Sequence, residues 1–139
     1  MRSRFGNLIT LAAPVPSRQL DNILAIQQRI FHMAIFELRT YDIVVGKMGE
    51  ITELYRAEGF PALQAGGFDA NLIAYFTGDI GALNQIIHLW RFDDDNARRA
   101  FWARLFADPA FMAFAAKLRP LLRAQNNKLM MAAPWGPSL

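Results

Sequence analysis

The chain has 139 residues, of which 53% are apolar and 19% are charged, and it contains no cysteine. A chain of this length fits one domain, and its composition is too apolar and too weakly charged for a disordered protein. Without cysteine, a disulfide scaffold, a zinc ribbon and a thiol nucleophile are excluded. The longest stretch without charge, Phe5–Ser17, has 13 residues and includes two prolines, so no membrane span is expected.

The net charge of +3 comes entirely from the N-terminal arm of the chain. Residues 1–32 carry four arginines and one aspartate, whereas residues 33–139 carry 11 basic and 11 acidic side chains. The module after residue 32 therefore has no positive field suited to phosphates, and no nucleic-acid partner is expected. Its basic clusters lie in helical patterns beside acidic residues, and we interpret them as solvated helix faces: Arg98, Arg99 and Arg104, and Lys117, Arg119 and Arg123.

Residues 1–32 are expected to lie outside the folded domain, as a leader or as sequence that precedes the true start. This arm contains arginine and serine, has no acidic residue before Asp21, and carries two prolines that break any helix. Asp21–His32 has the spacing of a short helix with Asp21 as a candidate N-cap. We place the start of the folded module at Met33 and the module at residues 33–139. A cytoplasmic location is expected, or a mitochondrial one if the arm is a presequence.

Hydrophobic periodicity predicts strands where apolar residues alternate and helices where they recur every three to four residues. Gly59 and Pro61 are expected to interrupt the first helix, with at most a further turn over Phe60–Gln64. Asp108 and Pro109 have the character of an N-cap and a first helical residue, so they restart a helix. In chain order the predicted elements are a strand at Ala34–Val45, a helix at Lys47–Ala57, strands at Asn71–Thr77 and Asn84–Phe92, helices at Asn96–Ala107 and from Pro109 up to Pro120, and a strand at Gln125–Ala132.

This βαββαβ order predicts a ferredoxin-like α+β fold, a four-stranded antiparallel sheet with both helices on one face. We expect Phe36, Leu38, Ile87 and Leu89 to pack under the helices. The open face of the sheet would then carry Glu37, Arg39, Tyr41, Ile86, His88, Trp90 and Phe92. Exposed aromatic side chains in that number would form a larger apolar patch than monomers usually tolerate. We therefore expect a homodimer that pairs these faces sheet against sheet.

Four segments of the module carry a resemblance to a known family: FELRTYDI at Phe36–Ile43, AYFTGDIGALNQIIHLWRF at Ala74–Phe92, ADPAF at Ala107–Phe111 and KLRPLL at Lys117–Leu122. In order and spacing they resemble the NIPSNAP family along residues 33–132. The resemblance implies a dimeric α/β barrel, as in small antibiotic-synthesis monooxygenases and muconolactone-isomerase-like proteins. It implies no particular reaction, because many members have no established activity. Eukaryotic relatives are associated with mitochondria and protein partners, whereas this short single module looks like the bacterial form.

Elimination narrows the chemistry that the module can carry. Ala65-Gly66-Gly67 lacks the spacing of a phosphate loop, and His88 is the only histidine after residue 32, so no metal site is expected. Serine is absent from residues 33–133, which rules out a serine-hydrolase triad there. A polar and aromatic set on the predicted strands remains as the candidate ligand site: Glu37, Arg39, Tyr41, Tyr75, His88 and Trp90.

The candidate set has a functional and a structural interpretation. Arg39 could hold a carboxylate or polarise a carbonyl, and His88 could move a proton near neutral pH. Alternatively, Glu37 and Arg39 simply pair, His88 donates to a backbone carbonyl, and Trp90 fills the interface. The pKa of His88 stays open at this stage, because Glu37 would raise it whereas Arg39 and burial would lower it.

Two functions are compatible with these observations. The first is a cofactor-independent oxygenase, isomerase or binding barrel for a small apolar, acyl or ring-containing compound. The second is a non-catalytic dimeric protein-interaction module. A pocket of about 300 Å³ or more that exposes Arg39 or His88 would favour the first, and an interior filled by side chains would favour the second.

Overall fold

The computed structural model describes residues 16, 18–22 and 34–136. The chain divides into two compact units, Met1–Phe31 and His32–Leu139. In the first unit residues 18–22 are helical, so Asp21 lies inside a helix and is not its N-cap. The remainder of the helix predicted for Asp21–His32, and the proposed start at Met33, lie outside the described residues.

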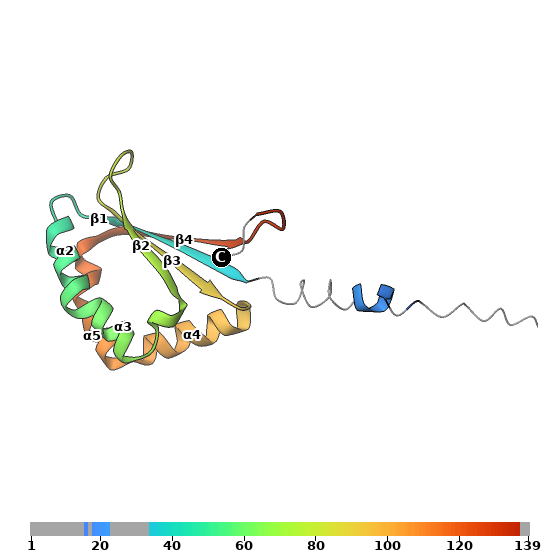
Figure 1. Ribbon diagram of the computed structural model, residues 1–139. Coiled ribbons are helices and arrows are strands. Elements are labelled where there is room, and N and C mark those ends of the chain that lie inside the picture. The colour runs from blue at the N-terminus through green and yellow to red at the C-terminus, as the bar shows by residue number, and fades with distance from the viewer. Residues whose placement is uncertain (1–15, 17, 23–33, 137–139) are drawn as a thin grey trace, which may run out of the picture. The chain divides into compact units, whose positions relative to one another are not determined.

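The second unit is an α+β fold of the ferredoxin-like type, as predicted (Figure 1). Its four strands form one antiparallel sheet in the order β2-β3-β1-β4. No helix within the described residues has the length and apolar character needed to cross a membrane. In chain order the elements are β1 (Ile35–Ile43), α2 (Met48–Leu54), a π-helix (Tyr55–Gly59), α3 (Phe60–Ala65), β2 (Leu72–Thr77), β3 (Gln85–Phe92), α4 (Asp95–Ala107), α5 (Pro109–Leu118) and β4 (Leu122–Met131).

The first helical region continues through Gly59 and Pro61, where we predicted an interruption. A π-helix joins α2 to α3, and the N–H of Phe60 donates to the carbonyl of Tyr55 five residues earlier. Pro61 thereby falls in the first turn of α3, where its missing N–H is tolerated. A Cβ atom at Gly59 would lie 2.6 Å from the ring of Phe114, so glycine lets the π-helix pack closely against α5.

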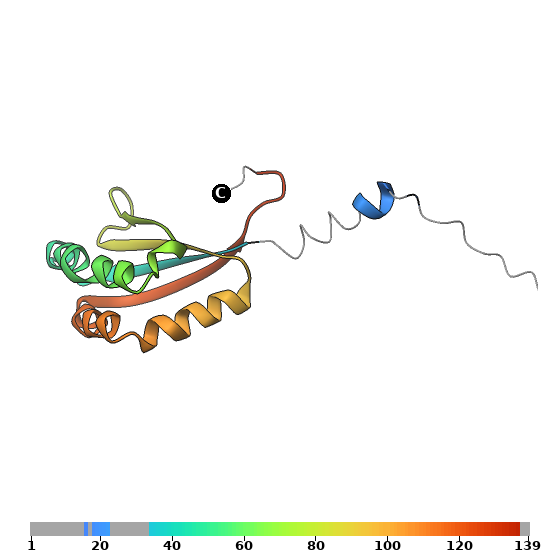
Figure 2. The ribbon, with the colours of Figure 1, turned by 60° about the horizontal axis from the view of Figure 1, so that its bottom comes forward.

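The helices after β3 begin where side chains cap them. Asp94 accepts a hydrogen bond of 2.7 Å from the N–H of Ala97, and Asp108 accepts one of 2.8 Å from the N–H of Phe111. The predicted restart at Asp108 and Pro109 is therefore correct, and Figure 2 shows α4 lying lengthwise below the sheet, with α5 following it and seen nearly end-on. The last strand begins at Leu122, three residues earlier than predicted.

Two core clusters fix the face of the sheet that the helices cover. The first joins the sheet to α2 and α5 and consists of Tyr41, Ile43, Ile51, Ile86, Phe114, Leu118 and Leu121. The second joins the sheet to α3 and α4 and consists of Leu63, Phe68, Trp90, Phe92, Phe101 and Leu105. The odd-numbered residues of β1 from Glu37 to Ile43 and the even-numbered residues of β3 therefore point toward the helices.

This arrangement is opposite to the predicted one. Leu38, Ile87 and Leu89, which we expected under the helices with Phe36, alternate with the core residues and lie on the other face of the sheet. Trp90 is only 2% exposed and Phe92 only 1%, because the helices bury both. The expectation that Ile86, Trp90 and Phe92 form an open face for dimerisation is therefore wrong.

Candidate functional site

All six candidate residues lie on the side of the sheet that faces the helices. Glu37, Arg39 and Tyr41 project from β1, Tyr75 from β2, and His88 and Trp90 from β3. Alternation puts them on one face, and the register aligns neighbours: Arg39 is opposite His88, Glu37 is opposite Trp90, and Tyr75 is opposite His88. The strands thus gather these side chains into one row between the sheet and the helices.

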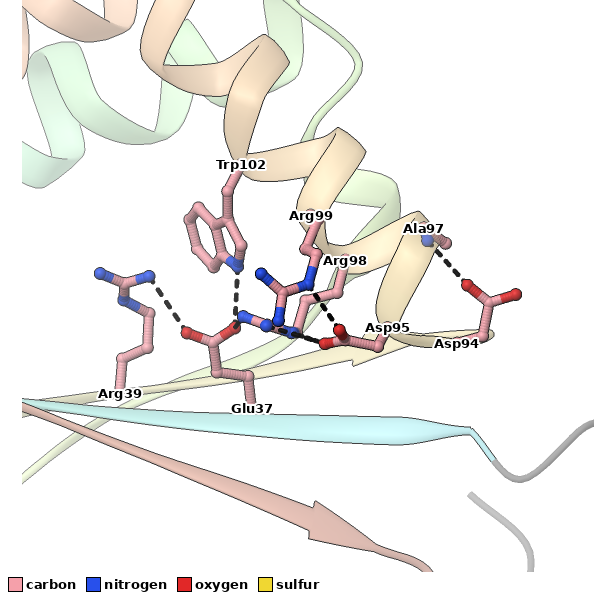
Figure 3. Close-up of polar contacts among 8 residues, drawn as sticks. All are labelled: Glu37, Arg39, Asp94, Asp95, Ala97, Arg98, Arg99 and Trp102. Carbon is pink, nitrogen blue, oxygen red and sulfur yellow. Dashed lines mark hydrogen bonds and ion pairs between the residues drawn. The ribbon is translucent and has the colours of Figure 1, made fainter.

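The carboxylate of Glu37 is the centre of a buried polar network (Figure 3). It accepts a hydrogen bond of 2.8 Å from Trp102 Nε1 and further bonds of 3.2 Å from Arg39 and 3.4 Å from Arg98. Arg98 also pairs with Asp95 at 2.8 Å. With its oxygens occupied by three donors, Glu37 anchors α4 to β1 and is not free to act on a ligand.

Arg98 is not part of a solvated helix face, in contrast to our interpretation of the basic cluster. Its side chain is 16% exposed, whereas that of Arg99 is 71% exposed. Arg98 and Trp102 are four residues apart on α4, and residues at this spacing share one helix face. The sequence signal for this was the spacing of Arg98 and Trp102: because they are four residues apart, an inward-facing Trp102 places Arg98 on the same face of the helix.

Arg39 is held in place on two sides. Its guanidinium carbon lies 4.2 Å from the ring centre of Trp102 and 5.8 Å from that of Tyr41. At these distances the face of an aromatic ring attracts a cation. One terminal nitrogen donates to Glu37, and Nε is buried without an acceptor among the described residues. Arg39 is therefore chiefly a partner of Glu37 and Trp102.

His88 is enclosed by three tyrosine rings. Its Nε2 lies 3.1 Å from the hydroxyl of Tyr55, and its ring makes edge contacts with Tyr41 at 4.6 Å and Tyr75 at 4.7 Å between ring centres. Burial, aided by the nearby charge of Arg39, lowers the pKa of His88 to about 3. Burial also raises the pKa of Tyr55 well above its usual value. The Tyr55–His88 pair is thus uncharged at neutral pH.

Two cavities border this row of side chains. An inner cavity of about 20 Å³ has walls that include Tyr41, His88 and Trp90. An outer, open pocket of about 290 Å³ has walls that include Thr52, Tyr55, Arg56, Phe60, Tyr75, Phe76, Thr77 and Ile86. Tyr55 and Tyr75 line both cavities and separate them, with their ring centres 5.5 Å apart. The outer pocket is therefore next to His88 but screened from it by two tyrosines. It has about the size that we required of a ligand pocket, but neither Arg39 nor His88 lines it, so that part of the expectation is not met.

Tyr55 is the main site residue that sequence reasoning missed. It falls within the helix that we predicted at Lys47–Ala57, yet it begins the π-helix and its hydroxyl lies against His88. Single π turns inside α-helices recur at functional sites because the extra residue changes which side chain faces inward. Among the residues that the structure describes, no group of three His, Asp or Glu side chains is arranged to hold a metal ion.

Solved structures with the same fold include proteins of related sequence. A NIPSNAP family protein with unknown function from Agrobacterium tumefaciens is 32% identical, with a TM-score of 0.70, 76% of this chain covered and 94% of that chain. An uncharacterised NIPSNAP-like domain protein from Burkholderia xenovorans is 33% identical, with a TM-score of 0.70 and 78% and 92% covered. An antibiotic biosynthesis monooxygenase shares only the fold, at 16% identity and a TM-score of 0.52, with 72% of this chain and 99% of that chain covered.

The sequence itself matches a family model. The model is that of NIPSNAP, and it matches residues 36–137, which is well over half of the chain. A search of curated proteins gives no match. The family model and the related structures agree with the resemblance carried by the strand and turn segments, and the chain belongs to the NIPSNAP family.

Proposed function

We propose that this protein binds a small, largely apolar, ring-containing compound in the outer pocket. The observation that carries this proposal is the volume of about 290 Å³ beside the aromatic side chains of Tyr55, Phe60 and Tyr75. An engineered apolar cavity of about 150 Å³ is already large enough to bind benzene. The pocket is close to the lower size limit of natural small-molecule sites, about 300 Å³, so it suits a single ring with a short substituent.

The electrostatics of the site favour binding over proton-transfer catalysis. A general base works best when its pKa is near the working pH, and burial holds the pKa of His88 at about 3. Tyr55 remains protonated because burial raises its pKa. The pair therefore offers polar atoms for hydrogen bonding but no group that exchanges a proton readily at neutral pH. No part of this binding role requires a cofactor.

Filling the outer pocket from its rim tests the proposal. Thr52 is exposed on α2 and lines the pocket, so Thr52→Phe should fill part of it without disturbing the core. We expect the wild-type chain to bind toluene, and the variant to bind it about tenfold more weakly. Calorimetric titration gives both dissociation constants.

The matched control is Glu50→Phe, which adds the same ring on the same helix at an exposed position outside the pocket. Its toluene affinity should equal that of the wild type. Equal affinity in all three proteins would mean that toluene binds elsewhere, and no binding to the wild type would refute the pocket as an apolar ring site.

We also propose that the protein forms a homodimer through the sheet face away from the helices, as the alternative function of a dimeric interaction module requires. Leu38 and Leu89 are paired at the centre of this face, with Ile87 beside them. Phe76, opposite Ile87 on β2, is 50% exposed. A second copy would cover this apolar strip around a two-fold axis.

A charge on the strip should separate the copies and leave each one folded. Leu89→Arg should raise the dimer dissociation constant at least about 100-fold, because it places an unpaired charge in the interface. Leu129→Arg is the control, since Leu129 is 51% exposed and lies on the helix side of β4. Sedimentation equilibrium and circular dichroism measure assembly and folding. A folded wild-type monomer at micromolar concentration would contradict this proposal.

A further inference from the structure

The indole N–H of Trp90 is a buried donor that the fold leaves without a partner. Trp90 is 2% exposed, and its Nε1 has no acceptor among the described residues. By contrast, Nε1 of Trp102, the neighbouring indole, donates to Glu37 at 2.8 Å. Buried polar groups are almost always hydrogen-bonded, and an unpaired one at a cavity is typical of a place where another molecule supplies the acceptor.

The inner cavity is the space beside Trp90 from which such an acceptor could reach it. Its volume of about 20 Å³ fits one water-sized group, since a cavity needs only about 10–15 Å³ to hold a water. Tyr55 and Tyr75 divide this cavity from the outer pocket, and both side chains line the two spaces. A ligand whose ring fills the outer pocket would therefore reach the inner cavity with one small substituent, passing between these two tyrosines.

The charges around the inner cavity favour an uncharged substituent. No lysine or arginine is among the residues that line it, and Arg39, whose charge acts on His88, already donates from one terminal nitrogen to Glu37 at 3.2 Å. Tyr41, Tyr55, Tyr75 and His88 form neutral walls, with burial holding the pKa of His88 at about 3. A carboxylate placed there would lose its hydration without gaining a free counter-charge.

We propose that the ligand of this site is a ring compound with one uncharged oxygen acceptor, such as an aryl ketone, whose oxygen accepts a hydrogen bond from Trp90 Nε1 in the inner cavity. This inference rests on the proposed function, because the ring occupies the outer pocket. The ring centres of Tyr55 and Tyr75 lie 5.5 Å apart, so the proposal requires the Tyr55 side chain, whose hydroxyl lies 3.1 Å from His88, to move when the oxygen enters.

Three probes of similar size test the proposal on the full chain: acetophenone, isopropylbenzene and benzoate. Acetophenone and isopropylbenzene have nearly the same shape, so they differ mainly in the ketone oxygen. We expect acetophenone to bind at least about tenfold more tightly than isopropylbenzene, and benzoate to bind more weakly than acetophenone. Trp90→Phe, which keeps a ring but removes the donor, should abolish the preference for acetophenone and leave the affinity for isopropylbenzene within about twofold.

A second measurement on the wild type keeps the test valid if Trp90→Phe does not fold. The chain has three tryptophans, so ¹H–¹⁵N spectra contain three indole N–H signals, and that of Trp135, which is 88% exposed, is an internal control. Acetophenone should shift the Trp90 signal and leave the Trp135 signal in place, whereas isopropylbenzene should shift neither through hydrogen bonding.

The outcomes separate this inference from the proposed function. Equal binding of acetophenone and isopropylbenzene, with no shift of the Trp90 signal, would overturn the inference and leave the outer pocket as a plain apolar site. If benzoate bound most tightly of the three probes, the proposal of an uncharged oxygen acceptor would be overturned, and the site would be an anion site. No binding of any probe would overturn both the inference and the proposed function.

Discussion

Replacing Glu37 by leucine is expected to lower the free energy of unfolding by about 3–5 kcal/mol, the usual cost of breaking a buried ion pair on one side. Glu37 is 1% exposed and accepts hydrogen bonds from Arg39, Arg98 and Trp102. Leucine fills a similar volume but leaves Arg39, 11% exposed, without its carboxylate and Trp102 without its acceptor. Urea denaturation followed by circular dichroism measures the loss.

An exposed pair provides the matched control for this substitution. Glu53 pairs with Arg56 at 2.6 Å, but the two side chains are 59% and 76% exposed. Glu53→Leu should therefore change the free energy of unfolding by less than about 1 kcal/mol. If Glu37→Leu costs no more than Glu53→Leu, the Glu37 network does not anchor α4 to the sheet.

A double variant distinguishes a structural Arg39 from a ligand-binding one. Glu37→Leu combined with Arg39→Met removes both charges, and it should recover much of the stability that Glu37→Leu loses, since no unpaired charge remains at β1. If Arg39 is structural, the double variant should bind acetophenone with the wild-type affinity. A folded double variant that no longer binds the probe would instead place Arg39 in the ligand site.

The order of the elements follows from local signals, and those signals are strong in this chain. Alternation in β1, the Asp108-Pro109 start of α5 and the apolar run of β3 each act over a few residues. The continuous helix through Gly59 was not predictable in this way. Its π turn is stabilised by close packing of Gly59 on Phe114, which is distant in sequence.

The covered face of the sheet was assigned wrongly for a physical reason. In β1 the apolar residues Phe36 and Leu38 alternate with Glu37 and Arg39, so the pattern pointed to the charged residues as the open side. Burial of Glu37 is possible only because Arg98 and Trp102, more than 60 residues later, supply donors. β3 gives no correction, because Ile86 and Ile87 make both of its faces apolar.

The candidate residues nevertheless came together, because strand alternation groups them whichever face is covered. Arg39 and His88 are opposite one another on β1 and β3 for this reason. The surroundings of His88 were not predictable, since the hydroxyl that contacts it comes from Tyr55 on a π-helix. The volumes of the two cavities depend on how Phe60, Tyr75 and Phe114 pack, which no local pattern reveals.

Lowering the pH from 7 to 5 is expected to destabilise the wild-type fold by about 2 kcal/mol through His88 alone. The folded protein holds the pKa of His88 at about 3, whereas an unfolded histidine has its ordinary value of 6.5. Between these values the unfolded chain binds a proton that the folded chain does not bind. The contribution of neutral His88 to the free energy of unfolding is therefore fully present above pH 6.5 and is lost progressively as the pH falls toward 3.

His88→Gln provides the comparison, because glutamine does not titrate and its amide can still bond to the Tyr55 hydroxyl. Between pH 7 and pH 5 the wild type should lose about 2 kcal/mol of unfolding free energy relative to the variant. Comparing the two proteins cancels every other titrating group, including His32. The same slope in both proteins would mean that His88 takes up its proton in the folded state. In that case the histidine would be hydrated, and the inner cavity would be open to water rather than closed by Tyr55 and Tyr75.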